Sequence, residues 1–252
     1  MKQQEFLILK GAYKNMNINI LAVDSTSNLA SVTVAKYDNT CKKIYYNENN
    51  DLKTHSEKLL PIIDKTLKEA NILDKDITTY LVTNGPGSFT GTRIGVTTIK
   101  GLTLYNNTKI CAFSSLEIMA HALFKLIETH DYIVAILDAK GGRIYYGIYQ
   151  FMGSDTNTIV PPTADTFENL KSTLSKMINN YIMCFDNIDS FIEKDEKSNN
   201  IYPINILINS SNILDYYTFL GDKTNYIKNT YDLDVEYVRP SMAERMKNGN
   251  KH

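Results

Sequence analysis

The most informative local pattern in the chain is NGPGSFTGTRIGVTTIKGL, residues 84–102. It follows a β-branched run (79–83) that predicts a strand, and it continues into residues whose apolar spacing predicts a helix (92–105). Backbone amides at a helix N-terminus form a natural anion site where glycine lets a ligand approach closely. A tight turn that packs the helix on the sheet explains the same glycines, and the Walker A motif is absent. The candidate phosphate-site residues in this turn are Gly85, Gly87 and Ser88.

The residues around this turn predict a half-domain with a known order of strands and helices. An apolar run at 17–23 predicts a first strand, and segments 29–35 and 43–46 predict two more strands after short turns. Residues 55–70 carry apolar side chains at helical spacing. With a further strand at 109–113, the order is β-β-β-α-β-α-β. This is the half-domain order of the actin-like ATPase (ribonuclease H-like) fold, so we predict an α/β chain of two such half-domains with mixed sheets.

The second half of the chain carries weaker patterns. Its predicted elements are a helix at 115–128, a strand at 132–137, a hairpin arm at 143–151, a helix at 166–179, a strand at 181–185, a helix at 210–220 and a strand at 235–239. The predicted organisation is an N-terminal extension (1–16), a partner-binding half-domain (17–113), a second half-domain (114–240) and a polar tail (241–252). The extension lacks the length and cleavage site of a secretory signal, and Met16 is an alternative start.

The composition excludes several classes of protein. The 252 residues include 27 basic and 28 acidic side chains, so neither a nucleic-acid surface nor a membrane surface is indicated. A hydrophobic content of 43% argues against disorder, and no apolar run approaches the roughly 20 residues of a membrane helix. Cys41, Cys111 and Cys184 lie far apart, which suits reduced thiols. We therefore expect a soluble cytoplasmic protein.

Few residues suggest chemistry. Asp24 closes the first predicted strand, where actin-like ATPases hold metal-bound phosphate, but turn capping by an Asp-Ser-Thr sequence is an equal alternative. His121 and His130 are nine residues apart with no carboxylate at metal-ligand spacing. The serine and cysteine residues lack a credible His-acid partner set. We predict no catalytic residues, no metal and no required cofactor.

The two predicted helices of the first half carry more apolar residues than one packed face needs. In the second of them apolar side chains spread right round the helix, and the helix at 55–70 has a wide apolar stripe. Burial inside a large monomer is one explanation. Exposed apolar helix faces usually mark an interface, so we favour a partner surface. The candidate interface residues are His55, Leu59, Ile63, Arg93, Ile94 and Ile99.

Several stretches resemble the TsaB (YeaZ) family, the partner subunit in bacterial tRNA threonylcarbamoyladenosine synthesis. They are ILAVDSTSNLASVTV (20–34), THSEKLLPIIDKTLKEANI (54–72), the glycine-rich stretch quoted first, SSLEIMA (114–120), LDAKGGRIYYGIY (137–149) and, more weakly, YVRPSMAER (237–245). The resemblance runs from about residue 19 to 149 and is thin thereafter. The pattern GPGSFTGxRxG is long and specific.

The resemblance implies an actin-like two-domain fold and a partner, TsaD, a larger paralogue that carries the chemistry. TsaD transfers a threonylcarbamoyl group to N6 of adenosine 37 in tRNAs that decode codons beginning with A, and the ATPase TsaE joins the pair. TsaB is regarded as a non-catalytic scaffold that forms homodimers when alone. The family thus implies no catalytic role for this chain, with Asp24 and the glycine-rich turn as a vestigial nucleotide site and ATP or ADP at the subunit interface left open.

Two positions depart from related patterns. The catalytic paralogue has a metal-binding His-x-x-x-His where this chain has Ser115 and Met119, and a hydroxyl and a thioether cannot replace two imidazoles for a hard metal. Lys140 stands where the family usually has arginine, which removes a fork-type contact. The rival interpretations are an ATP-hydrolysing enzyme that uses Asp24 and the glycine-rich turn, and a metallopeptidase.

Overall fold

The computed structural model describes residues 18–37, 42–50, 55–105, 108–127, 131–153, 155–177, 180–187, 204–227 and 229–238. It contains two five-stranded sheets, with strand orders β3-β2-β1-β4-β5 and β10-β9-β6-β7-β8. Each sheet mixes parallel and antiparallel pairs. The predicted α/β class with two mixed sheets is confirmed. No helix in the described ranges is long and apolar enough to cross a membrane.

The first sheet is formed by five strands that lie between residues 18 and 114. Its strands are β1 (Ile18–Asp24), β2 (Ala30–Tyr37), β3 (Lys42–Asn49), β4 (Thr79–Gly85) and β5 (Lys109–Ser114). The helices α2 (His55–Ala70) and α3 (Phe89–Thr103) and the short 3-10 turn η2 (Asp74–Asp76) connect them. Both helices pack on one face of this sheet. The carboxyl ends of β1 and β4 therefore lie side by side, because these two strands are parallel.

The second sheet repeats the strand-rich pattern with two strands that the sequence did not predict, one of eleven residues and one of two. Its strands are β6 (Tyr132–Asp138), β7 (Ile144–Met152), β8 (Asp155–Asp165), β9 (Tyr181–Phe185) and β10 (Ile204–Asn205). Neither β8 nor β10 was predicted, and β8 contains Pro161 and Pro162 and lies at the sheet edge, where a missing amide donor is tolerated. Helix α5 (Phe167–Met177) covers the outer face of this sheet.

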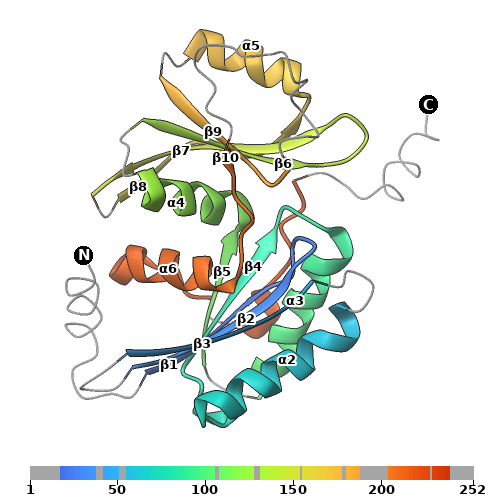
Figure 1. The fold of residues 1–252 in the computed structure, drawn as a ribbon, viewed down its shortest axis with the longest axis vertical. Coiled ribbons are helices and arrows are strands. Elements are labelled where there is room, and N and C mark those ends of the chain that lie inside the picture. Colours follow the sequence, from blue (N-terminus) through green and yellow to red (C-terminus); the bar gives the residue numbers. More distant parts are fainter. Residues whose placement is uncertain are drawn as a thin grey trace.

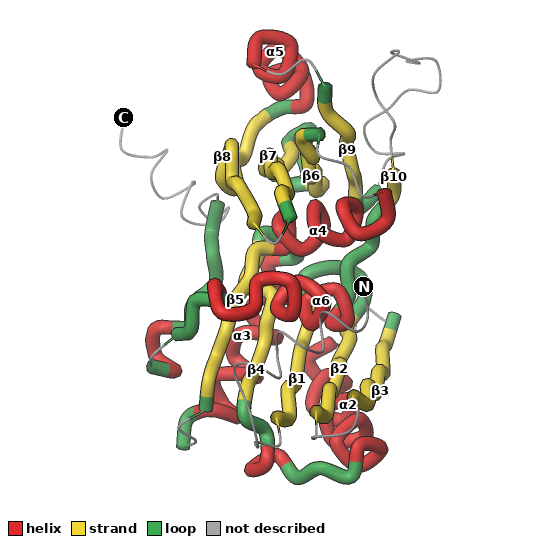
Figure 2. The backbone as a smooth tube through the Cα atoms, turned by 90° about the vertical axis from the view of Figure 1, so that its left-hand side faces the viewer, coloured by secondary structure: helices red, strands yellow, loops and turns green. Residues whose placement is uncertain are grey.

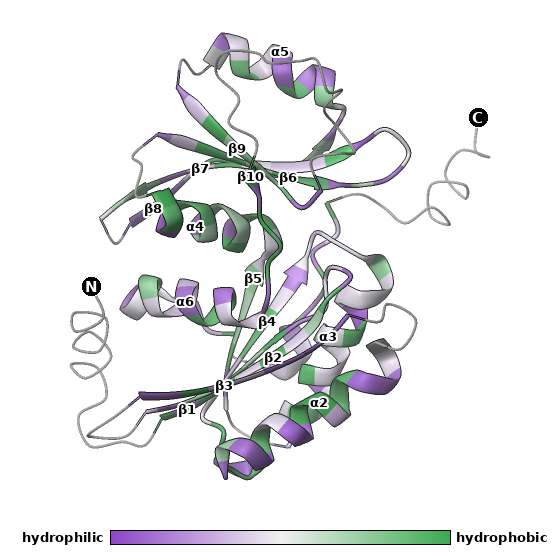
Figure 3. Ribbon diagram, in the orientation of Figure 1, coloured by the Kyte–Doolittle hydropathy of each residue, from purple (hydrophilic) through white to green (hydrophobic). Residues whose placement is uncertain are grey.

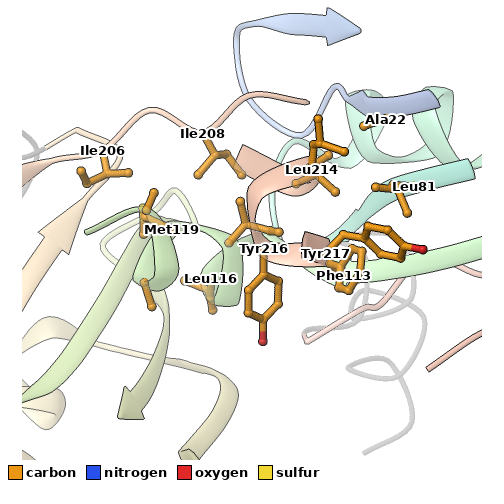
Figure 4. Close-up of a cluster of buried hydrophobic side chains, with 14 of the residues drawn as sticks. Ala22, Leu81, Phe113, Leu116, Met119, Ile206, Ile208, Leu214, Tyr216 and Tyr217 are labelled. Carbon is orange, nitrogen blue, oxygen red and sulfur yellow. The ribbon is translucent and has the colours of Figure 1, made fainter. Parts of the chain in front are cut away.

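Two helices fill the space between the sheets. Figure 1 shows α4 (Ser115–Ile127) under the second sheet and α6 (Ser210–Leu220) over the first, and Figure 2 shows the same order of layers from the side. One core cluster joins both helices to the facing sides of both sheets, and Figure 4 shows part of it. The half-domains therefore meet through a continuous apolar layer.

The strands supply apolar side chains to both of their faces. In β1, Ile18, Ile20 and Ala22 belong to the central cluster, whereas Leu21 and Val23 belong to the cluster under α2 and α3. Figure 3 shows the resulting concentration of apolar residues in the strands and in α4. Burial on both faces explains why β1 reads as a continuous apolar run rather than an alternating one.

The end of the chain returns to the first sheet, which differs from the predicted half-domain at 114–240. Helix α6 contacts β1, β2 and β4, and the Ser210 amide donates to Ser31 Oγ at 2.8 Å. Beyond the 3-10 turns η4 (Gly221–Lys223) and η5 (Thr230–Asp232), Ile227 bridges to Ile110 and Leu233 is buried under α3.

The predicted strand at 235–239 is wrong within its described residues. This segment is extended without forming a ladder, and the Glu236 amide makes one hydrogen bond to the Asn84 carbonyl at 2.8 Å. Cys111 and Cys184 are buried free thiols, as expected for reduced cysteines. The predictions for Cys41, His130, the extension at 1–16 and the tail at 241–252 lie outside the described residues.

Candidate functional site

Asp24 ends β1 as a fully buried carboxylate. Its Oδ1 accepts hydrogen bonds from Thr26 Oγ1 at 2.8 Å and from Thr83 Oγ1 on the neighbouring strand β4. The Thr26 amide also points to this oxygen, at 3.4 Å. Asp24 therefore caps the turn after β1 and ties it to β4, which is the structural alternative that the sequence left open. A role in holding phosphate stays a prediction.

The glycine-rich turn fits closely against the turn after β1. A Cβ atom at Gly87 would lie 2.5 Å from the Thr26 carbonyl oxygen, and one at Gly91 would overlap the Ser25 carbonyl oxygen. At Gly95 the Cβ would lie 2.6 Å from Ser25 Oγ. Such distances are far below van der Waals contact, so only glycine fits without a shift. These glycines are explained by close packing within the chain.

Three backbone amides around the start of α3 are hydrogen-bonded inside the chain. The Ser88 amide donates to the Thr26 carbonyl at 2.6 Å, and Ser88, as the N-cap, accepts from the Gly91 amide at 3.2 Å. The Thr92 amide donates to the Ser88 carbonyl at 2.8 Å. Because α3 starts at its cap, it begins at Phe89 rather than at the predicted residue 92. The contacts support the packing explanation for Gly87 and Ser88 and do not favour a phosphate site there.

The start of α4 has the wrong chemistry for the metal site of the catalytic paralogue. Ser115 and Met119 are both fully buried, and Met119 belongs to the central core cluster. No group of three or more His, Cys, Asp or Glu side chains in the described ranges is placed to hold a metal ion. Hydroxyl and thioether ligands would not hold a hard metal in place of two imidazoles.

A pair of acidic residues lies near the same helix start, and the sequence did not single it out. Burial, and after it the charge of Glu236 in the returning C-terminal segment, together raise the pKa of Glu117, in the first turn of α4, to about 7. Burial also raises the pKa of Glu236. Burial, and after it the charge of Glu117, raises the pKa of the hydroxyl of the buried Tyr149 in β7. The signal in the sequence was a single acid between two apolar residues, Leu116 and Ile118, in the first turn of α4.

The predicted interface on α2 requires a correction. Leu59 and Ile63 are 1% and 3% exposed, and both pack in the core cluster between α2 and the sheet. Ile99 of α3 is fully buried in the same cluster. The sheet face takes up nearly the whole apolar stripe, so these three side chains cannot contact a partner. The side chain of His55, which begins α2, lies outside the described residues.

The outward side of these helices presents a different set of residues. Arg93 is exposed and lies between two aromatic rings, with its guanidinium carbon 3.7 Å from the ring centre of Phe89 and 5.5 Å from that of Tyr237. Arg93 Nε donates to the Tyr237 hydroxyl at 2.6 Å. Ile94 is half-buried, and Leu60 of α2 is 54% exposed. Arg93 and Ile94 therefore remain on the predicted surface, and Phe89, Leu60 and Tyr237 join them.

Comparison with known proteins shows which family shares this fold and these motifs. A family model described as TsaD, tRNA N6-adenosine threonylcarbamoyltransferase, matches residues 49–248. A "tRNA threonylcarbamoyladenosine biosynthesis protein TsaB" of Buchnera aphidicola is 36% identical over 131 residues, which are 52% of this chain and 60% of that protein. The protein of the same name from Bacillus subtilis is 32% identical over 159 residues, 61% of this chain and 66% of that protein. The chain belongs to the family that the TsaD model describes, as a member of its TsaB group.

Solved structures of TsaB-type proteins share the fold. The structure described as YeaZ from Pseudomonas aeruginosa has a TM-score of 0.67 at 18% identity and covers 86% of this chain and all of that one. A second Pseudomonas aeruginosa structure, described as similar to peptidase YeaZ, has a TM-score of 0.73 at 19% identity, with 88% and 100% covered. The predicted actin-like architecture is confirmed by these likenesses. By sequence, the chain spans between 60% and 66% of the length of the two TsaB relatives described above.

Proposed function

We propose that this chain is a non-catalytic scaffold subunit in tRNA threonylcarbamoyladenosine biosynthesis. In this role it binds and activates a TsaD-type threonylcarbamoyltransferase, together with a TsaE-type ATPase. The complex modifies N6 of adenosine 37 in tRNAs that decode ANN codons, and the cytoplasm is its location. The observation that carries the proposal is membership of the TsaB group, whose members are named for this biosynthesis. The buried Ser115 and Met119 at the start of α4 support the non-catalytic part.

The outer face of α3 is the proposed docking surface for TsaD. Phe89, Ile94 and Gly101 lie on this side of the helix, and Leu60 of α2 extends it. A Cβ atom at Gly101 would meet no described atom within 4 Å, so packing inside the chain does not explain a glycine there. A glycine on an exposed helix allows the backbone of another helix to approach closely. When the partner is absent, the same face forms the homodimer.

The surface is tested with paired charge substitutions. A variant with Leu60→Asp and Ile94→Asp places two desolvated charges in the proposed interface, which costs several kcal/mol on binding. We expect it to lose co-purification with TsaD and to lose stimulation of threonylcarbamoyl transfer on unmodified tRNA. Because both residues are at least partly exposed, we expect the variant to fold like the wild-type chain.

The matched control is Leu73→Asp, which changes a 61%-exposed leucine after α2 in the same way. It should leave both binding and stimulation intact. If the double variant kept TsaD binding at wild-type affinity, the docking surface would be wrong while family membership would stand. If TsaD and TsaE modified tRNA fully without this chain, the scaffold function itself would be refuted.

A further inference from the structure

The outer edge of the first sheet is formed by β3, an eight-residue strand with the sequence KKIYYNEN. Figure 2 shows β3 as the last strand of this sheet, beside β2. It pairs with β2 in a continuous antiparallel register, and no described strand pairs with its other side. Backbone amides and carbonyls on the outer side of an edge strand can therefore pair with a further strand.

One face of β3 exposes apolar side chains along this edge. Ile44 lies opposite Ala35 of β2, a member of the central core cluster, so it lies on the side of the sheet that faces α6. Helix α6 packs on this side over β1, β2 and β4, and Ile44 and Tyr46 remain 49% and 36% exposed. On the other face, Tyr45 packs against the cluster under α2. The exposed apolar pair of β3 thus lies on a single face, next to the outer edge of the strand.

The charges of β3 are distributed unevenly along the strand. Lys42 and Lys43 are its first two residues, and Glu48, its one acid, is next to last. Lysines on an edge strand usually discourage pairing with another strand. When two β3 strands pair in an antiparallel manner, however, the basic end of one lies beside the acidic end of the other. The charge pattern therefore opposes parallel pairing of two copies and favours antiparallel pairing.

Symmetry and the pleat of the sheet restrict the register of such a pair. A two-fold axis perpendicular to the sheet places residue i of one copy opposite residue j of the other, and residue j opposite residue i. Residues directly opposite each other lie on the same face, so i and j are both even or both odd. One of these registers sets Lys42 opposite Glu48. The same register sets Ile44 opposite Tyr46 and places Tyr45 on the two-fold axis.

From this complementarity we infer that the outer edge of β3 binds the same edge of a second copy of this chain, which joins two five-stranded sheets into one of ten strands. Main-chain hydrogen bonds between the two edges hold the pair, as in other cases of strand addition. The cross-strand pairs Ile44–Tyr46 and Lys42–Glu48 each occur twice and fix the register. Helix α3 packs on β1 and β4, two or more strands away from this edge, so its outer face stays free. The inference is therefore independent of the proposed scaffold function.

The test is sedimentation velocity of the full chain at increasing concentration. The chain carries Ile94→Asp, which removes self-association through the outer face of α3 and leaves β3 unchanged, and we expect it to form dimers. Lys42→Glu or Glu48→Lys, added alone, should weaken dimerisation at least about tenfold, equivalent to about 1.4 kcal/mol, because each sets like charges opposite each other twice. The two substitutions together should restore dimerisation, because they reverse both ion pairs without removing them.

The matched control is Lys176→Glu, which makes the same change of net charge as Lys42→Glu at an exposed residue of α5, on the second sheet. It should dimerise like the chain with Ile94→Asp alone. The inference would be overturned by a chain that stays monomeric at every concentration, or by single charge variants that dimerise as strongly as the control. A double variant that is folded by circular dichroism but dimerises as weakly as the single variants would overturn the pairing of Lys42 with Glu48, and the register with it.

Discussion

Three glycines of one helix should respond in opposite ways to the same substitution. Gly91, Gly95 and Gly101 all lie in α3, and alanine is the better helix former by roughly 0.5–1 kcal/mol at each. What differs is the space that a methyl group would enter. The substitutions therefore test whether the glycine-rich turn is built for packing inside the chain.

The magnitudes follow from the atoms that a Cβ would meet. At Gly101 there is no described atom within 4 Å, so Gly101→Ala should stabilise the isolated chain by about 0.5–1 kcal/mol. At Gly95 the nearest atom is Ser25 Oγ at 2.6 Å, and moving it breaks its 2.8 Å hydrogen bond to the Gly91 carbonyl. That loss of about 1 kcal/mol offsets the helix gain. At Gly91 the Cβ would overlap a backbone carbonyl, and overpacking of this kind costs about 1–3 kcal/mol or more.

Urea unfolding followed by circular dichroism measures this order directly. We expect the free energy of unfolding to rise for Gly101→Ala, to change little for Gly95→Ala and to fall for Gly91→Ala. A Gly91→Ala variant as stable as Gly101→Ala would refute the packing explanation of the turn. In the presence of TsaD, Gly101→Ala should lose its advantage in stability over the other variants, because the methyl group keeps the proposed partner helix at a distance.

Two pH-dependence predictions concern buried titratable groups. The pKa of Glu117 rises from 4.5 to about 7 on folding, so between these pH values the folded chain binds more protons than the unfolded chain. Glu117 therefore lowers the free energy of unfolding as pH increases from 4.5 to 7. Glu117→Gln should therefore raise the free energy of unfolding at about pH 8, by no more than about 3 kcal/mol, and leave it nearly unchanged near pH 4. The pKa of His121 falls from 6.5 to about 4, so its contribution is present above pH 6.5 and is lost as pH falls to 4. His121→Phe should remove that loss. Urea midpoints measured across pH 4 to 8 check both predictions. A variant whose midpoint depended on pH as the wild type does would contradict the role assigned to the substituted residue.

The sequence predicted the local elements well where their periodicity is regular. The strand at 181–185 and the helix at 210–220 have the predicted bounds, since their apolar patterns are bounded by polar residues. It could not show which sheet α6 joins, because that depends on a contact between Ser210 and β2, about 180 positions away in the chain. The edge strand β8 was missed because two prolines interrupt its pattern.

Three of the predicted interface residues, Leu59, Ile63 and Ile99, are buried for a different reason. A count of apolar residues on α2 and α3 indicates how much surface needs cover, but not how much of it the chain's own sheet covers. The sheet below α2 buries Leu59 and Ile63 and leaves Leu60 outside, a difference of one position around the helix. Helical spacing alone cannot set the rotation of α2 about its axis, because that rotation depends on how the helix packs on the sheet.

The returning C-terminal segment connects the outer face of α3 with the acidic pair between the half-domains. Tyr237 stacks on Arg93 at the proposed docking surface, and the preceding residue, Glu236, raises the pKa of Glu117 at the start of α4. The Glu236 amide is also held by the Asn84 carbonyl at the end of β4. A partner that shifted the backbone at Tyr237 would also shift Glu236, because adjacent Cα atoms are held about 3.8 Å apart. Docking on α3 and the protonation of Glu117 would then be linked, and the linkage would act in both directions.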